Sequence, residues 1–413
     1  MKKFLSFLLA IGILISVAQF AHAAENYKLE NVVIFSRHNV RSPTVNGSKL
    51  LNEITTHKWK WTAAPGELSL RGGLLETAMG EYFRKYLESE NFLPDNYSPT
   101  EGEVKFYANS RNRTMSTAKY FSAGIFPVAN VEVEHKYKIE GKDEAFLTNF
   151  PSDDENYREK VIEEICKENN VKNLSEIGEK FNPEIATVEK ILDFKNSPYA
   201  KEKNISAFSR TDLGMKLEKG KDTALKGDMA TVHSAIDGLL MQIYEFPYTY
   251  QKSFGRKISD KEFAQIMKLH RFGVKTIHGT PEMAPDLAKP ILKFLSEEIA
   301  ANRKFTFICG HDSNLAAMFA TLGVEEYETL PNSLEIIPIG SKFVIEKRIG
   351  DDGIEYAKIY LLYQKLEQIK NLEILSLENP PQTYDLKFKT LQANSDGLYL
   401  YEDFVKLLNS KIK

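Results

Sequence analysis

Two arginines flank a single histidine where an apolar run ends near the start of the chain. Residues 31–36, NVVIFS, lead into RHNVRSP, which carries Arg37, His38 and Arg41. Clustered cations repel one another, so a folded protein keeps them together only where something negative lies among them. The planar fork of an arginine matches the oxygens of a phosphate two at a time. The stretch therefore predicts an anion site, and a phosphoryl group is the anion that suits it best.

Two later segments repeat the arrangement of a strand followed by a polar turn. EVKFYANS, residues 103–110, leads to Arg113, and KFTFICG, residues 304–310, leads to His311 and Asp312. Helical spacing of apolar residues follows both turns. In open α/β sheets, ligands bind beyond the carboxyl ends of the strands, where helix N-termini also offer N–H donors. We therefore expect the three turns to converge on one phosphate.

The residue types in these turns suit hydrolysis of a phosphate ester. A neutral His38, its pKa lowered by the nearby arginines, is a competent nucleophile and would form a phosphohistidine. Asp312 would give a proton to the departing alcohol, after a bound dianion has raised its pKa. Arginines already in place can stabilise the transferred group without a metal ion. We predict metal-independent activity that is best in mildly acidic solution.

Strand patterns that alternate with helical patterns predict an α/β fold, with a mostly parallel sheet and flanking helices. Further strand patterns occur at 342–347 and 357–364. Residues 134–268 instead show amphipathic helix patterns with few strand signals, which indicates an inserted, mostly α-helical domain that caps the active site. Residues 24–133 and 269–413 would then form the α/β catalytic domain.

The first 23 residues are typical of a cleaved secretory signal. Lys2 and Lys3 precede an apolar run from Phe4 to Phe20, and the small residues Ala21 and Ala23 follow it. No later stretch reaches the roughly 20 apolar residues of a spanning helix, so we expect no membrane association after cleavage. The formal net charge of −3 gives no drive toward nucleic acid. We predict a periplasmic or secreted protein that acts on a small molecule; a homodimer is left open.

Cysteine and histidine spacing predicts no metal site and no cofactor. Cys166 and Cys309 form no disulfide framework, and we expect buried free thiols, although pairing stays open. The chain has neither Cys-x-x-Cys nor His-Glu-x-x-His. The histidines outside the three turns show no ligand spacing, and the sequence assigns them no role: His57, His135, His233, His270 and His278.

The motifs together resemble those of a known family. RHNVRSP resembles the Arg-His-Gly-x-Arg-x-Pro signature of the histidine acid phosphatases, and HDSN resembles their second signature. The resemblance continues through GELSLRGG, YANSRNRT, SAIDGLLMQIYEFP, LAKP and PIGSKF, and it is strongest to the periplasmic glucose-1-phosphatase branch. It implies a catalytic nucleophile, a proton donor and a metal-free phosphate clamp. Position by position these are His38, Asp312, and the clamp of Arg37, Arg41, Arg113 and His311.

Two further positions are implicated by the branch. Asn39 replaces the family's usual glycine, as it does in that branch, and we hypothesise that its side chain narrows the pocket mouth against bulky substrates. Glu245 matches a pocket glutamate that would accept hydrogen bonds from sugar hydroxyls, although it also fits a plain surface carboxylate before Pro247. The family's disulfides have no counterpart here.

The leading interpretation is a phosphatase for small monoesters such as glucose 1-phosphate. A phytase acting on inositol hexakisphosphate is the alternative within the class. A sugar-phosphate-binding protein without activity would need neither His38 nor Asp312. A metal-dependent phosphohydrolase built on the His-Asp pair would lose its activity in chelator. Taken alone, each motif also fits a solvated basic turn or a capped helix start, and only their combination favours an active site.

Overall fold

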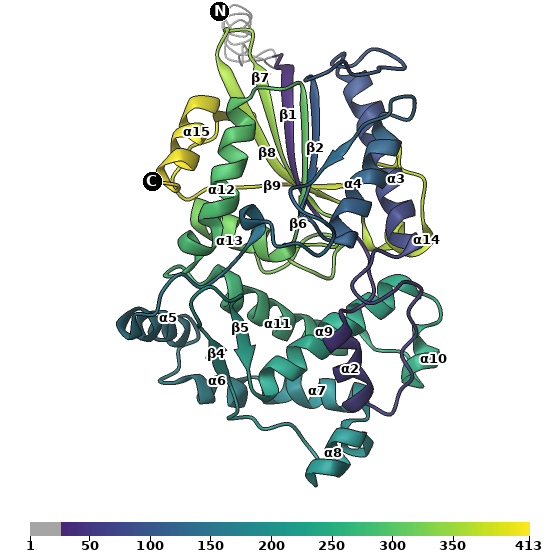
Figure 1. Ribbon diagram of the computed structural model, residues 1–413, viewed down its shortest axis with the longest axis vertical. Helices are drawn as coiled ribbons and strands as arrows, with labels where there is room; N and C mark the ends of the chain where they lie inside the picture. The colour runs from purple at the N-terminus through teal and green to yellow at the C-terminus, as the bar shows by residue number, and fades with distance from the viewer. Residues whose placement is uncertain (1–25) are drawn as a thin grey trace, which may run out of the picture.

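The computed structural model describes residues 26–413, so the predicted signal segment lies outside the described residues. A twisted sheet with helices on both faces forms one part of the molecule, and a mostly helical part lies at one end of that sheet (Figure 1). The predicted α/β class is confirmed. Within 26–413, no helix has the length and apolar character needed to cross a membrane.

The sheet has eight strands and is divided into a parallel and an antiparallel half. Its order is β10-β8-β7-β1-β6-β2-β3, and β9 also pairs with β8. β1, β6, β2 and β3 pair in parallel, whereas β7, β8, β9 and β10 pair antiparallel. The strands are β1 (Lys28–Arg37), β2 (Val104–Ala108), β3 (Val133–Glu134), β6 (Phe305–Gly310), β7 (Lys342–Ile349), β8 (Glu355–Tyr363), β9 (Gln382–Asp385) and β10 (Tyr399–Leu400). All five strands predicted from apolar patterns are present.

β1 lies in the middle of the sheet, and both of its faces are buried. Val32 and Ile34 pack in one hydrophobic cluster, and Val33 and Phe35 pack in another, because successive side chains of a strand point to opposite faces. A strand that is covered on both faces has apolar residues at successive positions, which explains the continuous apolar run in the sequence. The run therefore identifies the strand that carries Arg37 at its end.

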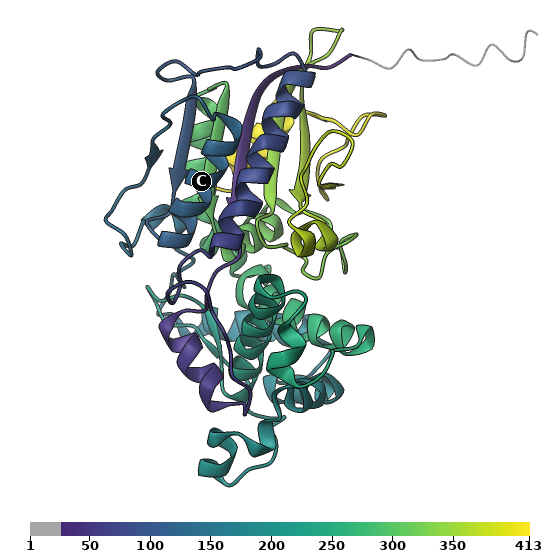
Figure 2. The same cartoon turned by 90° about the vertical axis from the view of Figure 1, so that its right-hand side faces the viewer.

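Helices cover the two faces of the sheet (Figure 2). The face of Val32 is packed by α3 (Leu70–Ser89) and α4 (Asn112–Ile125), which contribute Phe83 and Phe121 to the cluster. The opposite face is packed by α12 (Ala284–Ala300) and α13 (Asp312–Leu322), with Leu295 and Leu315. α15 (Tyr401–Ser410) lies beside them near the C-terminus.

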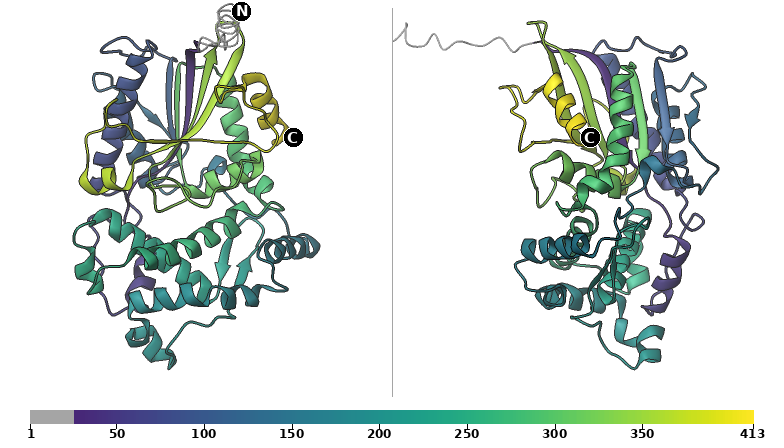
Figure 3. Two further views of the ribbon diagram at one scale, coloured as in Figure 1. Left: turned by 180° about the vertical axis from the view of Figure 1, so that it is seen from behind. Right: turned by 60° about the vertical axis from the view of Figure 1, so that its left-hand side comes forward.

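The helical part lies beyond the carboxyl ends of β1 and β6, as the views in Figure 3 also show. It contains α2 (Val45–Glu53), α5 (Glu155–Glu168), α6 (Leu174–Lys180), α7 (Asn182–Leu192), α8 (Pro198–Lys203), α9 (Asp228–Glu245), α10 (Tyr250–Phe254), α11 (Asp260–Val274) and the short hairpin of β4 (Gly214–Lys216) and β5 (Ala224–Lys226). The single-turn helices are η1 (Glu144–Phe146), η2 (Phe194–Asn196) and the π-turn η3 (Lys275–Gly279), and α14 (Leu366–Asn371) follows β8.

The two parts share one hydrophobic cluster, which runs from Phe35 and Phe343 in the sheet to Ile236 and Leu239 in α9. α2 comes from the N-terminal segment but packs against α9, and residue 268 lies inside α11. We therefore propose that the helical domain includes α2 and all of α11. The predicted limits of 134 and 268 otherwise stay a prediction.

Cys166 and Cys309 are both free and buried, which confirms the expectation of unpaired thiols. Cys309 lies inside β6, in the centre of the sheet. Burial raises the pKa of the Cys309 thiol, so it stays protonated and behaves as a small apolar side chain.

α3 and α4 approach each other closely because glycines face one another across their contact. A methyl group on Gly80 would overlap the Phe121 carbonyl, and one on Gly124 would overlap the Thr77 carbonyl. Both obstacles are backbone atoms of a helix, which cannot turn aside as a side chain would.

We therefore expect Gly124→Ala to lower the free energy of unfolding by about 1–3 kcal/mol, the usual cost of overpacking. Urea denaturation monitored by circular dichroism measures it. Gly47→Ala in α2 is the matched control, since a methyl group there meets only atoms at 3.4 Å or more. Equal stability of the Gly124→Ala variant and the wild type would contradict the close contact.

Candidate active site

The three predicted turns meet at the carboxyl ends of the parallel strands. Arg37, the last residue of β1, pairs with Gly310 at the end of β6. The His38 backbone N–H donates to the Gly310 carbonyl at 3.1 Å, and the Asn109 N–H donates to the Cys309 carbonyl at 3.0 Å. These bonds continue the ladder past the strand ends, so the turns after β1, β2 and β6 are held side by side.

Arg37 is a fully buried cation held by two carboxylates. Its Nη1 donates to Glu335 Oε1 at 2.7 Å and to the Ile337 carbonyl at 2.5 Å, and its Nη2 lies 3.0 Å from Asp312 Oδ2. Burial by itself acts to lower the pKa of Arg37, but Glu335 and Asp312 outweigh that effect and raise it. The guanidinium is therefore charged and fixed in place before any substrate arrives.

His38 is neutral, and its tautomer is set by a neighbouring carbonyl. Its Nδ1 lies 2.9 Å from the Asn39 carbonyl oxygen, which can only accept, so Nδ1 carries the proton and Nε2 keeps a free lone pair. Burial, and then the charges of Arg113 and Arg41, hold the pKa of His38 well below its usual range. The predicted effect of the arginines is present, although burial is the larger cause.

His311 is a second neutral imidazole beside His38. The two rings meet edge to face with centroids 5.5 Å apart. Asn109 Nδ2 donates to His311 Nε2 at 2.7 Å, so the proton of His311 is on Nδ1. Burial, followed by the charge of Arg113, lowers the pKa of His311 well below its usual range. The ring is thus neutral rather than cationic.

Asp312 is the first residue of α13 and faces the same turns. Besides its ion pair with Arg37, its Oδ1 accepts from the Ser313 backbone N–H at 2.9 Å. The side chain is 37% exposed. Burial acts to raise the pKa of Asp312, but the charge of Arg37 outweighs it and holds the pKa far below its usual range. Asp312 is therefore a carboxylate before an anion binds.

Arg41 and Arg113 complete a set of cations whose donors are not all used. Arg41 Nη2 lies 3.3 Å from Asp237 Oδ2. Burial, and then the charge of Arg41, lower the pKa of Arg113 to about 10, which still leaves it charged in acidic solution. Among the described residues, the Nε atoms of Arg37, Arg41 and Arg113 are buried without a hydrogen-bond partner, as are those of Arg71 and Arg84. An unpaired buried donor costs free energy, and an anion bound among the three clustered arginines would recover it.

The structure corrects the hypothesis for Asn39. Its side chain is buried under the turn, where Nδ2 donates to Glu76 Oε1 at 2.7 Å and Oδ1 accepts from the Val40 N–H at 2.8 Å. Only 2% of the residue is exposed. Glu76 also binds the buried Lys342 at 2.9 Å. Asn39 therefore ties the turn to a buried ion pair, and its side chain is not exposed at a pocket mouth.

Glu245 also lies away from the predicted position. It is the last residue of α9, where it accepts a hydrogen bond from Thr62 and lines a shallow hollow with Arg71 and Tyr248. The cavity lined by Asp312 does not include it. The acidic residue that α9 does bring to this cavity is Asp237, about two helical turns earlier. In a helix of 3.6 residues per turn, residues 237 and 245 point about 80° apart, so the two side chains face different surroundings.

Sequence reasoning missed the carboxylates that hold the arginines. Glu335 is 2% exposed, and its Oε2 accepts from Tyr244 Oη at 2.8 Å and from the Ile339 N–H at 3.2 Å while Oε1 binds Arg37. Glu335 and Asp237 are each a single acid within an otherwise apolar stretch, LEIIP and AIDGLL. A lone buried acid requires a partner, and that signal could have found both.

The structure also brings three histidines to the site that the sequence left without a role. A cavity of about 400 Å³ lies between Arg41 and Asp312 on one side and the helical part on the other. His233 comes from α9, His270 from α11 and His278 from the π-turn η3. Their spacing along the chain gave no sign of this, because two helices and a turn must pack before the rings meet.

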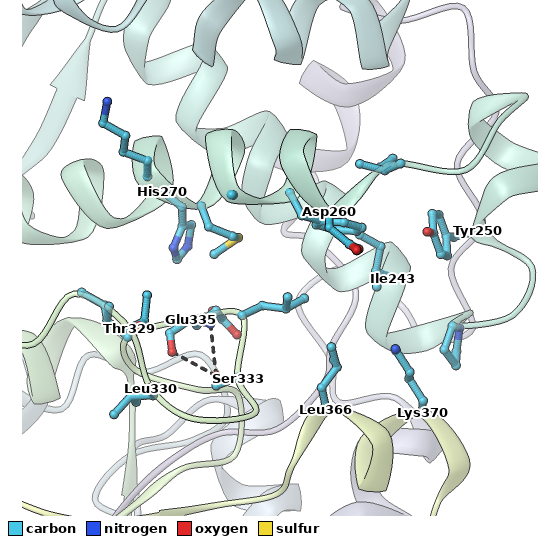
Figure 4. Close-up of a pocket in the computed structure, with 18 of the residues that line it drawn as sticks. Ile243, Tyr250, Asp260, His270, Thr329, Leu330, Ser333, Glu335, Leu366 and Lys370 are labelled. Carbon is cyan, nitrogen blue, oxygen red and sulfur yellow. Dashed lines mark hydrogen bonds between the residues drawn. The ribbon is translucent and has the colours of Figure 1, made fainter. Parts of the chain in front are cut away.

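A second cavity, of about 700 Å³, lies on the other side of His270 (Figure 4). Its walls come from α9, α10 and α11 on one side and from the 328–336 loop and α14 on the other. Glu335 lines it as well, so the carboxylate that holds Arg37 lies between the catalytic turns and this second space.

The comparisons with known proteins agree with this geometry. The model of the histidine phosphatase superfamily (branch 2) matches residues 28–360, so the chain belongs to this superfamily. Glucose-1-phosphatase of Salmonella typhimurium is 28% identical over 420 residues, which cover 100% of both chains. Glucose-1-phosphatase of Providencia rettgeri is 29% identical over 92% of this chain and 91% of its own. The resemblance seen in the motifs is thereby confirmed.

Among solved structures, the apo form of Hafnia alvei phytase superposes with a TM-score of 0.85. It is 24% identical and the match covers 94% of this chain and 97% of that one. The likeness shows that the two proteins share a fold.

The buried imidazoles make stability depend on pH. Burial lowers the pKa of His270 to about 4, whereas an unfolded histidine titrates near 6.5. Between these values the unfolded chain binds a proton that the native state does not, so the free energy of unfolding rises as pH rises from about 4 to about 6.5. His270 accounts for about 3 kcal/mol of that change.

Urea denaturation of the phosphate-free protein at several pH values in this window measures the slope. His270→Phe should make the free energy of unfolding depend less steeply on pH, because phenylalanine does not titrate. The same slope in the variant and in the wild type would contradict a neutral, buried His270.

Proposed function

We propose that this protein is an exported acid phosphatase that hydrolyses small phosphate monoesters, with sugar phosphates such as glucose 1-phosphate as the preferred class. The observation that carries the proposal is a neutral His38 Nε2 surrounded by arginines with unpaired buried donors. The family and the names of the two relatives support it. Export to the periplasm or outside is supported by the signal-like segment of residues 1–23.

The proposed reaction has two steps. His38 Nε2 attacks phosphorus, and the bond between phosphorus and the alcohol oxygen breaks while that oxygen takes a proton from Asp312. Water then attacks the phosphohistidine, gives a proton back to the Asp312 carboxylate, and the Nε2–P bond breaks to release inorganic phosphate. Arg37, Arg41 and Arg113 neutralise the charge on the three phosphoryl oxygens throughout.

Asp312 must be protonated for the first step, although its pKa is low before an anion binds. Arg37 is the strongest favourable charge on the carboxylate. A bound phosphate dianion shares that guanidinium and adds its own negative charge beside the carboxyl, and both effects raise the pKa of Asp312. Substrate binding thus creates the acid that the reaction needs, more completely as the solution becomes more acidic.

The cavity beside Asp312 favours a sugar phosphate over inositol hexakisphosphate. A leaving group with five more phosphates needs several cations around it. Arg41 is the one cationic side chain among the described residues that line this cavity, and Asp237 already pairs with it. The rest of the polar lining is uncharged or acidic, which suits an alcohol that carries no further phosphate.

Release of inorganic phosphate from glucose 1-phosphate and from inositol hexakisphosphate, at about pH 5 and in chelator, tests the proposal. We expect turnover in chelator with a higher kcat/KM for glucose 1-phosphate. His38→Ala should lower kcat by about a thousandfold or more while the folded variant still binds phosphate. Loss of wild-type activity in chelator would indicate a metal-dependent enzyme, and a preference for inositol hexakisphosphate would indicate a phytase.

Asp312→Asn separates the proton donor from the phosphate clamp. An asparagine cannot give up a proton, so hydrolysis of glucose 1-phosphate should slow by about 10²-fold or more. Hydrolysis of p-nitrophenyl phosphate should slow far less, because its leaving group departs without a proton. Steady-state rates on both esters measure the difference. Equal slowing would contradict the donor role.

A further inference from the structure

The three histidines all line the cavity beside Asp312. His233 and His270 lie nearly parallel, with ring centroids 5.5 Å apart and planes inclined by 14°. His278 follows where α11 changes into the π-turn η3. Such turns interrupt the regular helix ladder and are frequent at functional sites. Here the turn brings a third imidazole to the cavity that the other two already line.

Two of the three rings keep a buried nitrogen without a partner. Within residues 26–413, His270 Nδ1 and His278 Nδ1 make no hydrogen bond, whereas the His233 ring lies against Gly273 of α11. His270 as a whole is only 5% exposed. Burial is the largest cause that lowers the pKa of each of these imidazoles to about 4. In mildly acidic solution the rings are therefore neutral, and each can donate or accept according to its tautomer.

The rest of the cavity also offers groups that form hydrogen bonds. Thr44, Asn46 and Ser234 are exposed hydroxyl and amide groups on its rim, and Asp237 supplies a carboxylate. The apolar lining comes from Leu50, Leu51, Val274 and Ile277. No group of histidine, cysteine and acidic side chains within residues 26–413 has the arrangement of a metal site. A cavity lined by neutral imidazoles therefore suits a ligand that forms hydrogen bonds.

We propose that His233, His270 and His278 form the leaving-group subsite of the phosphatase and select a polyhydroxylated alcohol without further phosphates. Asp312 and Arg41 line the same cavity as the three rings, so an alcohol whose oxygen lies at Asp312 extends from there toward the imidazoles. A hydroxyl both donates and accepts, which matches a neutral imidazole in either tautomer. A volume of about 400 Å³ falls within the range of small-molecule sites.

The subsite rests on the proposed phosphatase function, and its test compares two alcohols. His278→Phe keeps a planar ring and removes both nitrogens, whereas His278→Asn keeps a polar atom near the position of Nδ1. We expect His278→Phe to lower kcat/KM for glucose 1-phosphate about two- to tenfold more than kcat/KM for phenyl phosphate, whose leaving group has no other hydroxyl. His278→Asn should restore part of the ratio. The pair His270→Phe and His270→Asn repeats the comparison at the second ring.

His135→Phe is the matched control, because His135 is exposed and lies outside the cavity. It should leave the ratio of the two kcat/KM values unchanged. Equal losses on both esters in the His278→Phe and His270→Phe variants, with no recovery in the asparagine variants, would overturn the subsite while leaving the phosphatase function intact. Wild-type protein that hydrolyses neither ester would overturn both.

A measurement on the wild type covers the case in which the variants do not fold. Free glucose should inhibit hydrolysis of phenyl phosphate at a lower concentration than cyclohexanol, which has a ring of similar size with one hydroxyl. Inhibition by cyclohexanol at an equal or lower concentration would show that the cavity selects for apolar shape, and it would overturn the proposal.

Discussion

The buried charge of Arg37 is the constraint on which the rest of the site depends. A guanidinium that is 1% exposed is stable only if its charge is matched by carboxylates in contact, and Glu335 and Asp312 provide the match. Glu335 comes from the segment before β7, and Asp312 begins α13, so the ion pairs fix both segments against the end of β1. Glu335 also binds Tyr244 of α9, which connects the same charge to the helical part. One cation thereby orients elements from three regions of the chain.

The two carboxylates around Arg37 are not equivalent, and their difference is what makes chemistry available. Glu335 is almost completely buried, and its Oε2 accepts from two donors besides Arg37, the Tyr244 hydroxyl and the Ile339 N–H. Asp312 is more exposed and has one backbone donor. A phosphate that binds Arg37 therefore raises the pKa of Asp312 more than the pKa of Glu335. The carboxylate that is free to change its protonation is therefore Asp312, the group proposed as the proton donor.

Much of the catalytic half could be predicted from the sequence, because its residues lie next to strand ends. Arg37, His38, His311 and Asp312 each adjoin a strand with an unmistakable apolar pattern, and parallel strands bring their carboxyl ends to one edge. The groups that were missed or misplaced depend on contacts between distant segments. Asn39 has a side chain that could point into the pocket or under the turn, and only the buried pair of Glu76 and Lys342 decides that it points under.

The same reason explains why the alcohol side of the site escaped prediction. His233, His270 and His278 have no common spacing, and they come together only when α9, α11 and η3 pack against one another. The arginines proposed to hold the phosphate are positively charged, and the sheet places them. The three histidines proposed to bind the alcohol are neutral, and the packing of helices places them. Since the two sides come from different parts of the fold, substitutions in α9, α11 and η3 can change which alcohol fits without disturbing the arginines that hold the phosphate.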